Sequence, residues 1–422
     1  MLKSYVTILG KAVRAATRLR GGGSAFPGLV VERIDPDFIK RTLTSLPRGV
    51  VIVSGTNGKT TTTKMVVELL EGQGLRVFTN RTGSNFTRGV AAALLGEIDL
   101  HGKLHTDIAV LELDEAHAVH FVRTIPPRYS LILNVMRDQL DRFGEIDSTA
   151  NLLRIIANAT SNTVVLNRED RRIADLQNSL ITQQVRFFGL SDDLLATFPC
   201  DDQLHGGISL SSTINADVSL TKFDGHNATF QLGDRLIKTP LKLSGIYNVY
   251  NAAAAFALVR AILGEEVDEK SLVNTLANIT PAFGRGEKFI INDQPLELVL
   301  VKNPSGFRLG LQSFDPSGYA TMIAINDNYA DGRDLSWLWD VPFESLQTDG
   351  VKQISGMRAY DMALRLQYDE VSIDSVEPKI GRAFKRFMAS DKQQPKRIYC
   401  TYTAMLALRR QIGKIVDVES IG

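Results

Sequence analysis

The 422-residue chain is too long for one ordinary domain and suits two or three. Its 44% hydrophobic and 23% charged residues are typical of a globular protein, and 48 Lys and Arg against 47 Asp and Glu give a net charge of +1. This balance argues against general nucleic-acid binding, the lack of an apolar run of roughly 18 residues argues against a membrane span, and two cysteines exclude a disulfide scaffold or a four-cysteine zinc site.

Residues 1–45 are predicted to form a basic amphipathic helix and a lead-in. Apolar residues recur there at helical spacing among several cations, and the first acidic residue is Glu32. The Gly21-Gly22-Gly23-Ser24 run then ends the helix. Three interpretations stay open: a helix packed on the body of the protein, contact with an anionic membrane surface, or an organelle transit peptide.

A largely parallel sheet is predicted within residues 46–290. Apolar runs of strand length alternate with stretches of helical periodicity, which is typical of an α/β fold with helices on the faces of the sheet. Residues 191–240 differ, because their Ser, Thr, Asp and Gly content and short alternating pieces favour a β-rich excursion. The expected strands are Val50–Val53, Leu75–Thr79, Ile108–Leu111, Leu131–Val135, Val164–Leu166 and Val185–Phe188, followed by a helix from Val249 to Leu263.

A smaller, doubly wound α/β domain is predicted for residues 291–422. Gly284-Arg285-Gly286 indicates a turn near the boundary before it. The expected strands are Leu296–Val301, Met322–Ile325 and Ile398–Thr401, and the expected helices are Arg358–Gln367 and Ile380–Met388.

The most informative motif follows the first predicted strand and opens a helix; it reads Gly55-Thr56-Asn57-Gly58-Lys59-Thr60-Thr61. Glycines let backbone N–H groups surround phosphate oxygens, and the helix N-terminus adds partial positive charge. Lys59 can reach the terminal phosphates, and the Thr60 hydroxyl can ligate Mg²⁺. Val53 stands where the general pattern has its first glycine, so this is a variant phosphate loop.

Acidic residues follow the predicted strand Ile108–Leu111. Ligands of open α/β sheets bind at the carboxyl ends of strands, where Glu112 could hold Mg²⁺ directly or through water. A solvated acidic loop is the alternative for Glu112, and more so for Glu115. Together with His117 and His120, Glu115 could also be a transition-metal site, although no further ligand is spaced to complete it.

Polar residues also follow the predicted strand Leu131–Val135. This places Asn134 and Asp138 at another strand's carboxyl end, where ligands bind. A role in the site and a structural salt-bridge role remain equally open for these two residues.

These motifs together resemble the Mur ligase superfamily, whose ATP loop reads GTNGKTT, as here. The resemblance spans residues 50 to 290 and also rests on Glu112, Leu133-Asn134-Val135, Val165-Leu166-Asn167, Gly245-Ile246-Tyr247-Asn248-Val249-Tyr250-Asn251 and Gly284-Arg285. The C-terminal part resembles the MurT family, the ligase-type subunits of lipid II isoglutaminyl synthases. Its matching segments are Lys302-Asn303-Pro304 and the run from Asn326 to Trp337.

The resemblance implies a P-loop Mur ligase central domain, a Rossmann-like C-terminal domain and dependence on ATP and Mg²⁺. Carried over by position, Lys59 and Thr60 would hold the phosphates and Mg²⁺, and Glu112 would support the metal. Asn248 and Arg285 would contact the nucleotide.

The MurT family amidates the D-glutamate α-carboxylate of the lipid II stem peptide, and we expect an acyl phosphate intermediate. The ammonia comes from a GatD-like glutaminase, so the resemblance implies a heterodimer that works in the cytoplasm, at the inner face of the membrane, in peptidoglycan biosynthesis. Asp334 matches the aspartate that completes the glutaminase Cys–His pair; by spacing alone it would be a turn residue. Neither Cys200 nor Cys400 lies in a Gly-rich nucleophile turn, which also favours a separate glutaminase chain.

Three departures from the superfamily narrow the prediction. Many members carry a four-cysteine zinc ribbon where this chain has only Cys200, so no zinc is expected. Leu152 stands in place of a carbamylated lysine and Gln139 in place of a histidine, which argues against an amino-acid-adding enzyme. The alternatives are a Mur-type or folylpolyglutamate-type ligase that joins an amino acid to a carboxylate, and a non-catalytic ATP-binding scaffold.

Overall fold

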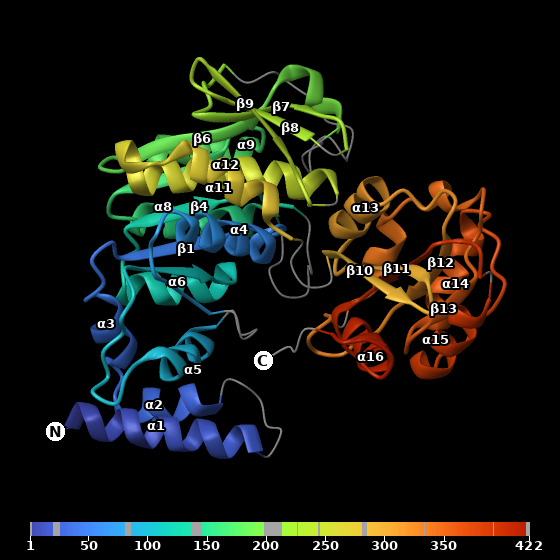
Figure 1. Cartoon of the computed structure of the whole chain (residues 1–422), viewed down its shortest axis with the longest axis horizontal. Coiled ribbons are helices and arrows are strands. Elements are labelled where there is room, and N and C mark those ends of the chain that lie inside the picture. Colours follow the sequence, from blue (N-terminus) through green and yellow to red (C-terminus); the bar gives the residue numbers. More distant parts are fainter. Residues whose placement is uncertain are drawn as a thin grey trace.

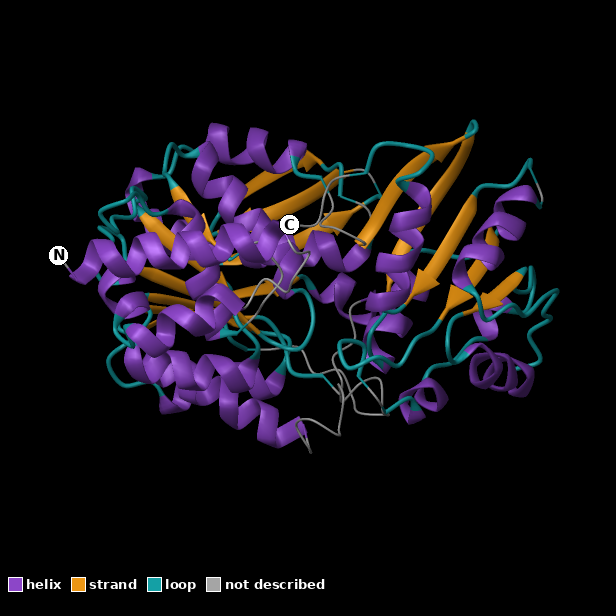
Figure 2. Cartoon of the chain, turned by 90° about the horizontal axis from the view of Figure 1, so that it is seen from below, coloured by secondary structure: helices purple, strands orange, loops and turns teal. Residues whose placement is uncertain are grey.

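A computed structural model describes the chain at residues 2–19, 26–80, 86–136, 146–197, 213–225, 227–243, 245–280, 285–332, 334–390 and 392–418. These residues form two sheets that lie beside each other along the length of the molecule (Figures 1 and 2). The larger sheet has the strand order β2-β3-β1-β4-β5-β6-β7-β8-β9, and the smaller has the order β10-β11-β14-β12-β13.

The larger sheet is parallel from β2 to β7 and antiparallel from β7 to β9. Its central strands are buried along their length, because helices cover both faces and strands in such sheets are apolar throughout. The strands are β1 (Val50–Ser54), β2 (Val77–Thr79), β3 (Ile108–Glu112), β4 (Tyr129–Ile132), β5 (Thr163–Asn167), β6 (Gln184–Leu190), β7 (Val218–Phe223), β8 (Asn227–Leu232) and β9 (Arg235–Pro240).

Two apolar cores lie on opposite faces of this sheet. One contains side chains of α4 (Lys59–Gly72), α11 (Ile246–Leu263) and α12 (Glu269–Asn278). The other contains side chains of α1 (Leu2–Leu19), α2 (Phe26–Ile34), α3 (Phe38–Leu43), α5 (Thr87–Glu97), α6 (Glu115–Thr124), α8 (Ile146–Ala159) and α9 (Arg171–Ala174). None of the helices in the described part of the chain is long and apolar enough to cross a membrane.

Strand β4 ends earlier than the apolar run Leu131–Val135 predicts. The carbonyl of Leu133 accepts a hydrogen bond from the Asn167 side chain, and the Val135 N–H donates to Asp170. These backbone groups therefore bond to side chains at the sheet edge instead of to a neighbouring strand, while Leu133 and Val135 stay buried. Within residues 191–240, β7, β8 and β9 extend the sheet, and residues 198–212 lie outside the described part.

The smaller sheet is parallel except for β10 (Arg285–Ile291), which pairs antiparallel with β11 (Gln294–Leu300). We expected a turn at Gly284-Arg285-Gly286; instead Arg285 begins β10, and Gly286, with φ 80°, lies at a register shift of that strand. The other elements are α13 (Pro304–Ser313), β12 (Ala320–Ala324), β13 (Gln353–Ser355), α14 (Ala359–Tyr368), α15 (Ile380–Ala389), β14 (Lys396–Cys400) and α16 (Tyr402–Ile412).

Helices cover both faces of the smaller sheet as well. The apolar core on one face contains side chains of α13 and α14, and the core on the other contains side chains of α15 and α16. This is the doubly wound arrangement predicted for the C-terminal part of the chain. Short 3₁₀ helices also occur, at η1 (Asp175–Ser179), η2 (Asp192–Thr197), η3 (Gly264–Glu266), η4 (Ser336–Asp340) and η5 (Glu344–Leu346).

Candidate nucleotide site and a second polar loop

The phosphate loop joins β1 to α4, and its two glycines are required by the backbone. Gly55 has φ 133° and Gly58 has φ 88°. Residues other than glycine adopt positive φ values of this kind only under strain. A Cβ atom on Gly58 would lie 2.8 Å from Asn251 Oδ1, and one on Gly55 would lie 2.9 Å from the backbone nitrogen of Asn134. The loop is therefore held tightly between the ends of β4 and α11.

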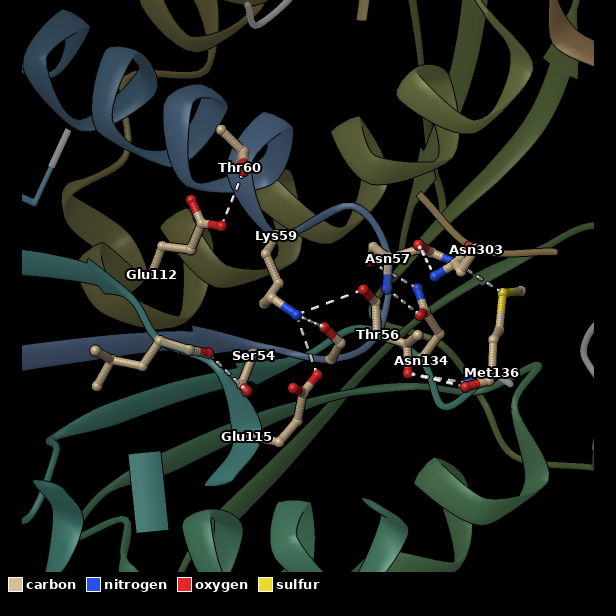
Figure 3. Close-up of polar contacts among 12 residues, drawn as sticks. Ser54, Thr56, Asn57, Lys59, Thr60, Glu112, Glu115, Asn134, Met136 and Asn303 are labelled. Carbon is tan, nitrogen blue, oxygen red and sulfur yellow. Dashed lines mark hydrogen bonds and ion pairs between the residues drawn. The ribbon is translucent and has the colours of Figure 1, made fainter. Parts of the chain in front are cut away.

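Lys59, the first residue of α4, is nearly fully buried and folds back over the loop. Its Nζ donates to the Gly55 carbonyl at 2.5 Å and to Glu115 Oε1 at 3.1 Å (Figure 3). The solvated-loop interpretation of Glu115 is wrong, because this side chain is 3% exposed. A buried carboxylate needs a charged or hydrogen-bonding partner, and Lys59 supplies one.

Thr60 and Glu112 meet at the start of the same helix. The Thr60 hydroxyl donates to Glu112 Oε1 at 2.8 Å (Figure 3). The backbone of Glu112 is held by both side-chain atoms of Asn80, which lies just after β2. Hydroxyl and carboxylate oxygens are the ligands that Mg²⁺ prefers, so this pair fits a magnesium ion. Asn80 was missed by sequence reasoning, although it follows a predicted strand as Glu112 does.

The structure does not assemble the transition-metal site considered for Glu115, His117 and His120. Glu115 pairs with Lys59, and the His117 ring packs edge-on against Phe86 with 4.1 Å between centroids. No group of three or more His, Cys, Asp or Glu side chains arranged to hold a metal ion occurs in the described ranges of the chain.

Asn57 connects the phosphate loop to both sheets. Its backbone N–H donates to Asn134 Oδ1 at 2.9 Å, and the Asn134 amide donates back to the Asn57 carbonyl at 3.0 Å. The Asn57 side-chain oxygen accepts from Asn303 at 3.3 Å, and Asn303 also caps α13 by accepting from the Gly306 N–H at 2.6 Å (Figure 3). Asn134 therefore belongs to the site, whereas Asp138, Gln139 and Asp141 lie outside the described residues.

A cavity opens beside the loop between the two sheets. Its walls come from Asn57, Asn134 and Asn248 on one side and from Lys302 and Phe314 on the other. The backbone of Arg285 lies in β10, but its side chain is outside the described part of the chain. Asn248 thus lines the cavity next to the phosphate loop, and the placement of the Arg285 guanidinium stays a prediction.

Two buried groups on the floor of this cavity were not singled out from the sequence. Asp170 accepts hydrogen bonds from the N–H groups of Val135 and Ile173, and burial raises its pKa to about 6. The Tyr250 hydroxyl donates to Asn167 Oδ1 at 2.5 Å, and burial raises the pKa of Tyr250. Loss of water at these positions disfavours the charged forms, and with a pKa of about 6 Asp170 takes up its proton only below neutral pH.

A second polar loop, residues 326–334, follows β12 of the smaller sheet. Asp331 is buried, and its carboxylate accepts from the Thr403 N–H, the Thr403 hydroxyl and the Asn328 N–H. Burial raises the pKa of Asp331. Asp334 is partly exposed, and its Oδ1 accepts from the Ser336 N–H at 2.9 Å. Asp331 therefore anchors the loop, while Asp334 sits in a turn at its end.

An exposed apolar stripe lies next to this loop. Tyr360, Leu364 and Tyr368 recur every fourth residue on α14 and are each more than half exposed. The ring of Trp339 packs edge-on against Tyr368 with 4.9 Å between centroids, and Met357, whose N–H donates to Asn326, extends the stripe to the loop. Exposed aromatic and Met side chains of this kind are typical of protein interfaces.

Comparison with known proteins gives two family matches that together span most of the chain. The Mur ligase middle domain matches residues 53–259, and the MurT ligase C-terminal domain matches residues 300–405. The "Lipid II isoglutaminyl synthase (glutamine-hydrolyzing) subunit MurT" of Streptococcus pneumoniae is 30% identical over 93% of each chain. The protein of the same name from Staphylococcus aureus is 27% identical over 90% of this chain and 91% of that protein.

Solved structures agree on the fold. MurF ligase from Thermotoga maritima in complex with ADP has a TM-score of 0.67 at 18% identity, and covers 92% of this chain and 84% of that chain. MurF from Acinetobacter baumannii has a TM-score of 0.68 at 18% identity, and covers 91% and 81%. Likeness at this identity concerns the fold, and it confirms the α/β Mur ligase architecture predicted from the sequence.

Proposed function

The chain belongs to the MurT family of ATP-dependent Mur ligases, and from this premise we propose that it is the ligase subunit of a lipid II isoglutaminyl synthase. Its reaction converts the D-glutamate α-carboxylate of the lipid II stem peptide to the amide. The observation that carries the proposal is the assembled phosphate site, Lys59 with the Thr60–Glu112 pair, in a chain whose C-terminal part is of the MurT type.

Nucleotide binding is assigned to the phosphate loop and the adjoining cavity. The backbone from Gly55 to Thr61 surrounds the phosphates, and Lys59 moves from the Gly55 carbonyl to the terminal phosphate oxygens. Thr60 and Glu112 hold Mg²⁺, which neutralises phosphate charge when bound. Asn248, in the cavity wall, and Arg285 contact the rest of the nucleotide. The closeness of the loop, the Thr60–Glu112 pair and the cavity supports this assignment.

The carboxylate must first gain a leaving group, because ammonia cannot expel an oxide ion from an unactivated carboxylate. A carboxylate oxygen attacks the γ-phosphorus of ATP, the bond to the bridging oxygen breaks, and ADP leaves. Ammonia then attacks the acyl carbon, phosphate leaves with the former carboxylate oxygen, and the nitrogen loses a proton. Lys59 stabilises the charge on the transferring phosphoryl group. Catalysis of this kind depends on positioning and electrostatic stabilisation and requires no protein nucleophile.

The ammonia is assigned to a separate GatD-like glutaminase, which docks on the smaller domain in the cytoplasm. Cys400 cannot serve as a nucleophile, because it is fully buried in β14 and burial raises its thiol pKa; Cys200 lies outside the described residues. The α14 stripe beside loop 326–334 supports docking of a partner there. Asp334, at the end of this loop, then completes the partner's Cys–His pair.

Isotope transfer tests the ligase step. The full chain is mixed with ATP, Mg²⁺, ammonium and a lipid II-type substrate labelled with ¹⁸O in the D-glutamate α-carboxylate. An acyl phosphate route moves one ¹⁸O into inorganic phosphate for each amide formed. Unlabelled phosphate would overturn the mechanism, and the absence of any amide while ATP is bound would overturn the ligase assignment in favour of a scaffold.

The nitrogen source tests the partner. Ammonium should support amidation by the purified chain alone, whereas glutamine should do so only after a glutaminase subunit is added. Amide formation from glutamine by the chain alone would contradict the two-subunit proposal while leaving the ligase assignment intact.

A further inference from the structure

We propose that the outward face of α1 docks the protein on an anionic lipid surface. The inner face of this helix packs against the rest of the protein. Val6, Thr7 and Gly10 are buried against α2 and α5, and a Cβ atom on Gly10 would lie only 2.6 Å from the Leu95 side chain. The helix is therefore fixed in place, and its opposite face is presented by the fold in one orientation.

That opposite face is apolar. Five residues of α1 are exposed in the described part of the helix, none is polar, and at 100° per residue they fall on one side: Tyr5, Ile8, Ala12, Ala15 and Ala16. The Tyr5 residue is 65% exposed and Ile8 is 54% exposed. A helix that packs on a protein with one face ordinarily turns polar residues to water with the other, so this pattern needs a second apolar contact.

The positive charge of α1 favours an anionic lipid surface as the binding partner of this face. The helix contains Lys3, Lys11, Arg14 and Arg18 and no acidic residue. Lys11 is partly buried and borders the apolar face, where it can snorkel to lipid headgroups, whereas the Arg14 guanidinium packs against Gly96 of α5. Each cation contributes about 1 kcal/mol beside an anionic bilayer. A second copy of the chain would bring the same cations against one another, so charge disfavours self-association through this face.

The position of α1 permits such contact. It is the outermost helix at its end of the molecule (Figure 1), and it lies across the near side when the molecule is viewed from that end (Figure 2). Two large apolar side chains and the bordering Lys11 support reversible, in-plane attachment, not insertion across the bilayer. This inference does not depend on the proposed ligase activity, because attachment is measured without nucleotide or peptide.

Vesicle sedimentation of the full chain tests the proposal. We expect binding to vesicles that contain phosphatidylglycerol, little binding to vesicles of phosphatidylcholine alone, and a decline as salt is raised. The variant Tyr5→Asp/Ile8→Asp should weaken binding by about ten-fold or more, since it places two anions on the docking face. The matched control is Ile181→Asp, because Ile181 is 93% exposed on the loop before β6 and lies outside α1.

Other measurements keep the outcomes separate. Both variants should keep the unfolding temperature of the parent, because all three substituted side chains are exposed. Amidation of a soluble, lipid-free stem peptide should be unchanged, which separates loss of docking from loss of ligase function. Equal binding by parent and Tyr5→Asp/Ile8→Asp would overturn the proposal. So would a dimer of the parent chain that this variant dissociates, since the face would then be covered by a second copy.

Discussion

The phosphate loop and the loop at residues 326–334 both follow the carboxyl end of a parallel strand, yet they are built differently. Around the phosphate loop, Lys59, Thr60 and their partners Glu115 and Glu112 satisfy one another within the chain. In the second loop, the buried carboxylate of Asp331 is a structural anchor, and the exposed end carries no comparable cluster in the described residues. The contacts around the phosphate loop are complete within one chain, whereas the second loop leaves Asp334 partly exposed at its anchored end, as its proposed role toward a partner requires.

The largest effect is expected at the phosphate loop. Lys59→Ala should lower the kcat of amidation by about 10³-fold with ammonium and with glutamine alike, because transition-state charge on the phosphoryl group loses its main cationic partner. The same change removes the ammonium that pairs with buried Glu115, which should cost about 3 kcal/mol of unfolding free energy.

A double variant separates these two effects. Lys59→Met with Glu115→Gln should regain most of the unfolding free energy in a denaturant titration, yet stay inactive in the amidation assay. If activity returned with stability, Lys59 would be a structural residue and the contrast between the two loops would fail.

The second loop should give a selective effect. Asp334→Asn is expected to lower glutamine-driven amidation by about 10³-fold while ammonium-driven amidation stays at the parental rate, because only the partner's Cys–His pair loses its carboxylate. The asparagine still accepts from the Ser336 N–H, so the unfolding temperature should not change.

The neighbouring Asp340 offers a matched control. It is exposed, and Asp340→Asn removes a carboxylate from the same region without the assigned role. An equal loss of glutamine-driven and ammonium-driven amidation in Asp334→Asn would show that this loop, like the phosphate loop, serves the ligase centre.

The cavity floor predicts a pH dependence of stability. The pKa of Asp170 is raised to about 6, so between pH 4 and 6 the folded chain keeps a proton that the unfolded chain has lost. The unfolding free energy should therefore fall through this window as pH rises, by up to about 3 kcal/mol from this group. Asp170→Asn should flatten the slope in denaturant titrations across this range, and an unchanged slope would exclude Asp170 as its source.

The smallest effect is expected at the link between the two sheets. Asn303→Asp keeps an oxygen to accept from the Gly306 N–H but removes the amide that donates to Asn57. Loss of one such bond costs about 1 kcal/mol, which corresponds to about a five-fold rise in the KM for ATP with kcat little changed. Asn303→Ala should also lower the unfolding temperature, because it removes the cap of α13. An unchanged KM in Asn303→Asp would mean that the bond does not steady the loop.

Local patterns were sufficient to predict most of the fold. The strands β1, β3 and β5 are buried on both faces, so each is an uninterrupted apolar run whose limits match the prediction within one residue. The same rule placed β4 too late, because Leu133 and Val135 are buried beneath the site loops beyond the strand's end. The turn expected at Arg285-Gly286 proved to be an irregular strand start, where glycine marks a bulge.

The residues of the site likewise divide into those that local sequence predicts and those that depend on contacts between distant segments. The phosphate loop and Glu112 could be predicted, since each lies directly after a strand and carries the residue types that phosphate and Mg²⁺ require. The burial of Glu115 could not, because its partner Lys59 lies 56 positions earlier and the surrounding sequence is typical of a solvated loop. The contact of Asn57 with Asn303 spans 246 positions and exists only once the two sheets have packed.

The cavity with walls from both sheets constrains any chimera of this enzyme. A hybrid chain that carried the C-terminal half of another ligase would replace Lys302 and Phe314 together with the proposed glutaminase-docking surface. Such an exchange would change the nitrogen-source specificity and the binding of the nucleotide together, so the two properties could not be transferred separately. A graft meant to alter only the nitrogen source should retain the segment from Lys302 to Phe314 and begin beyond it.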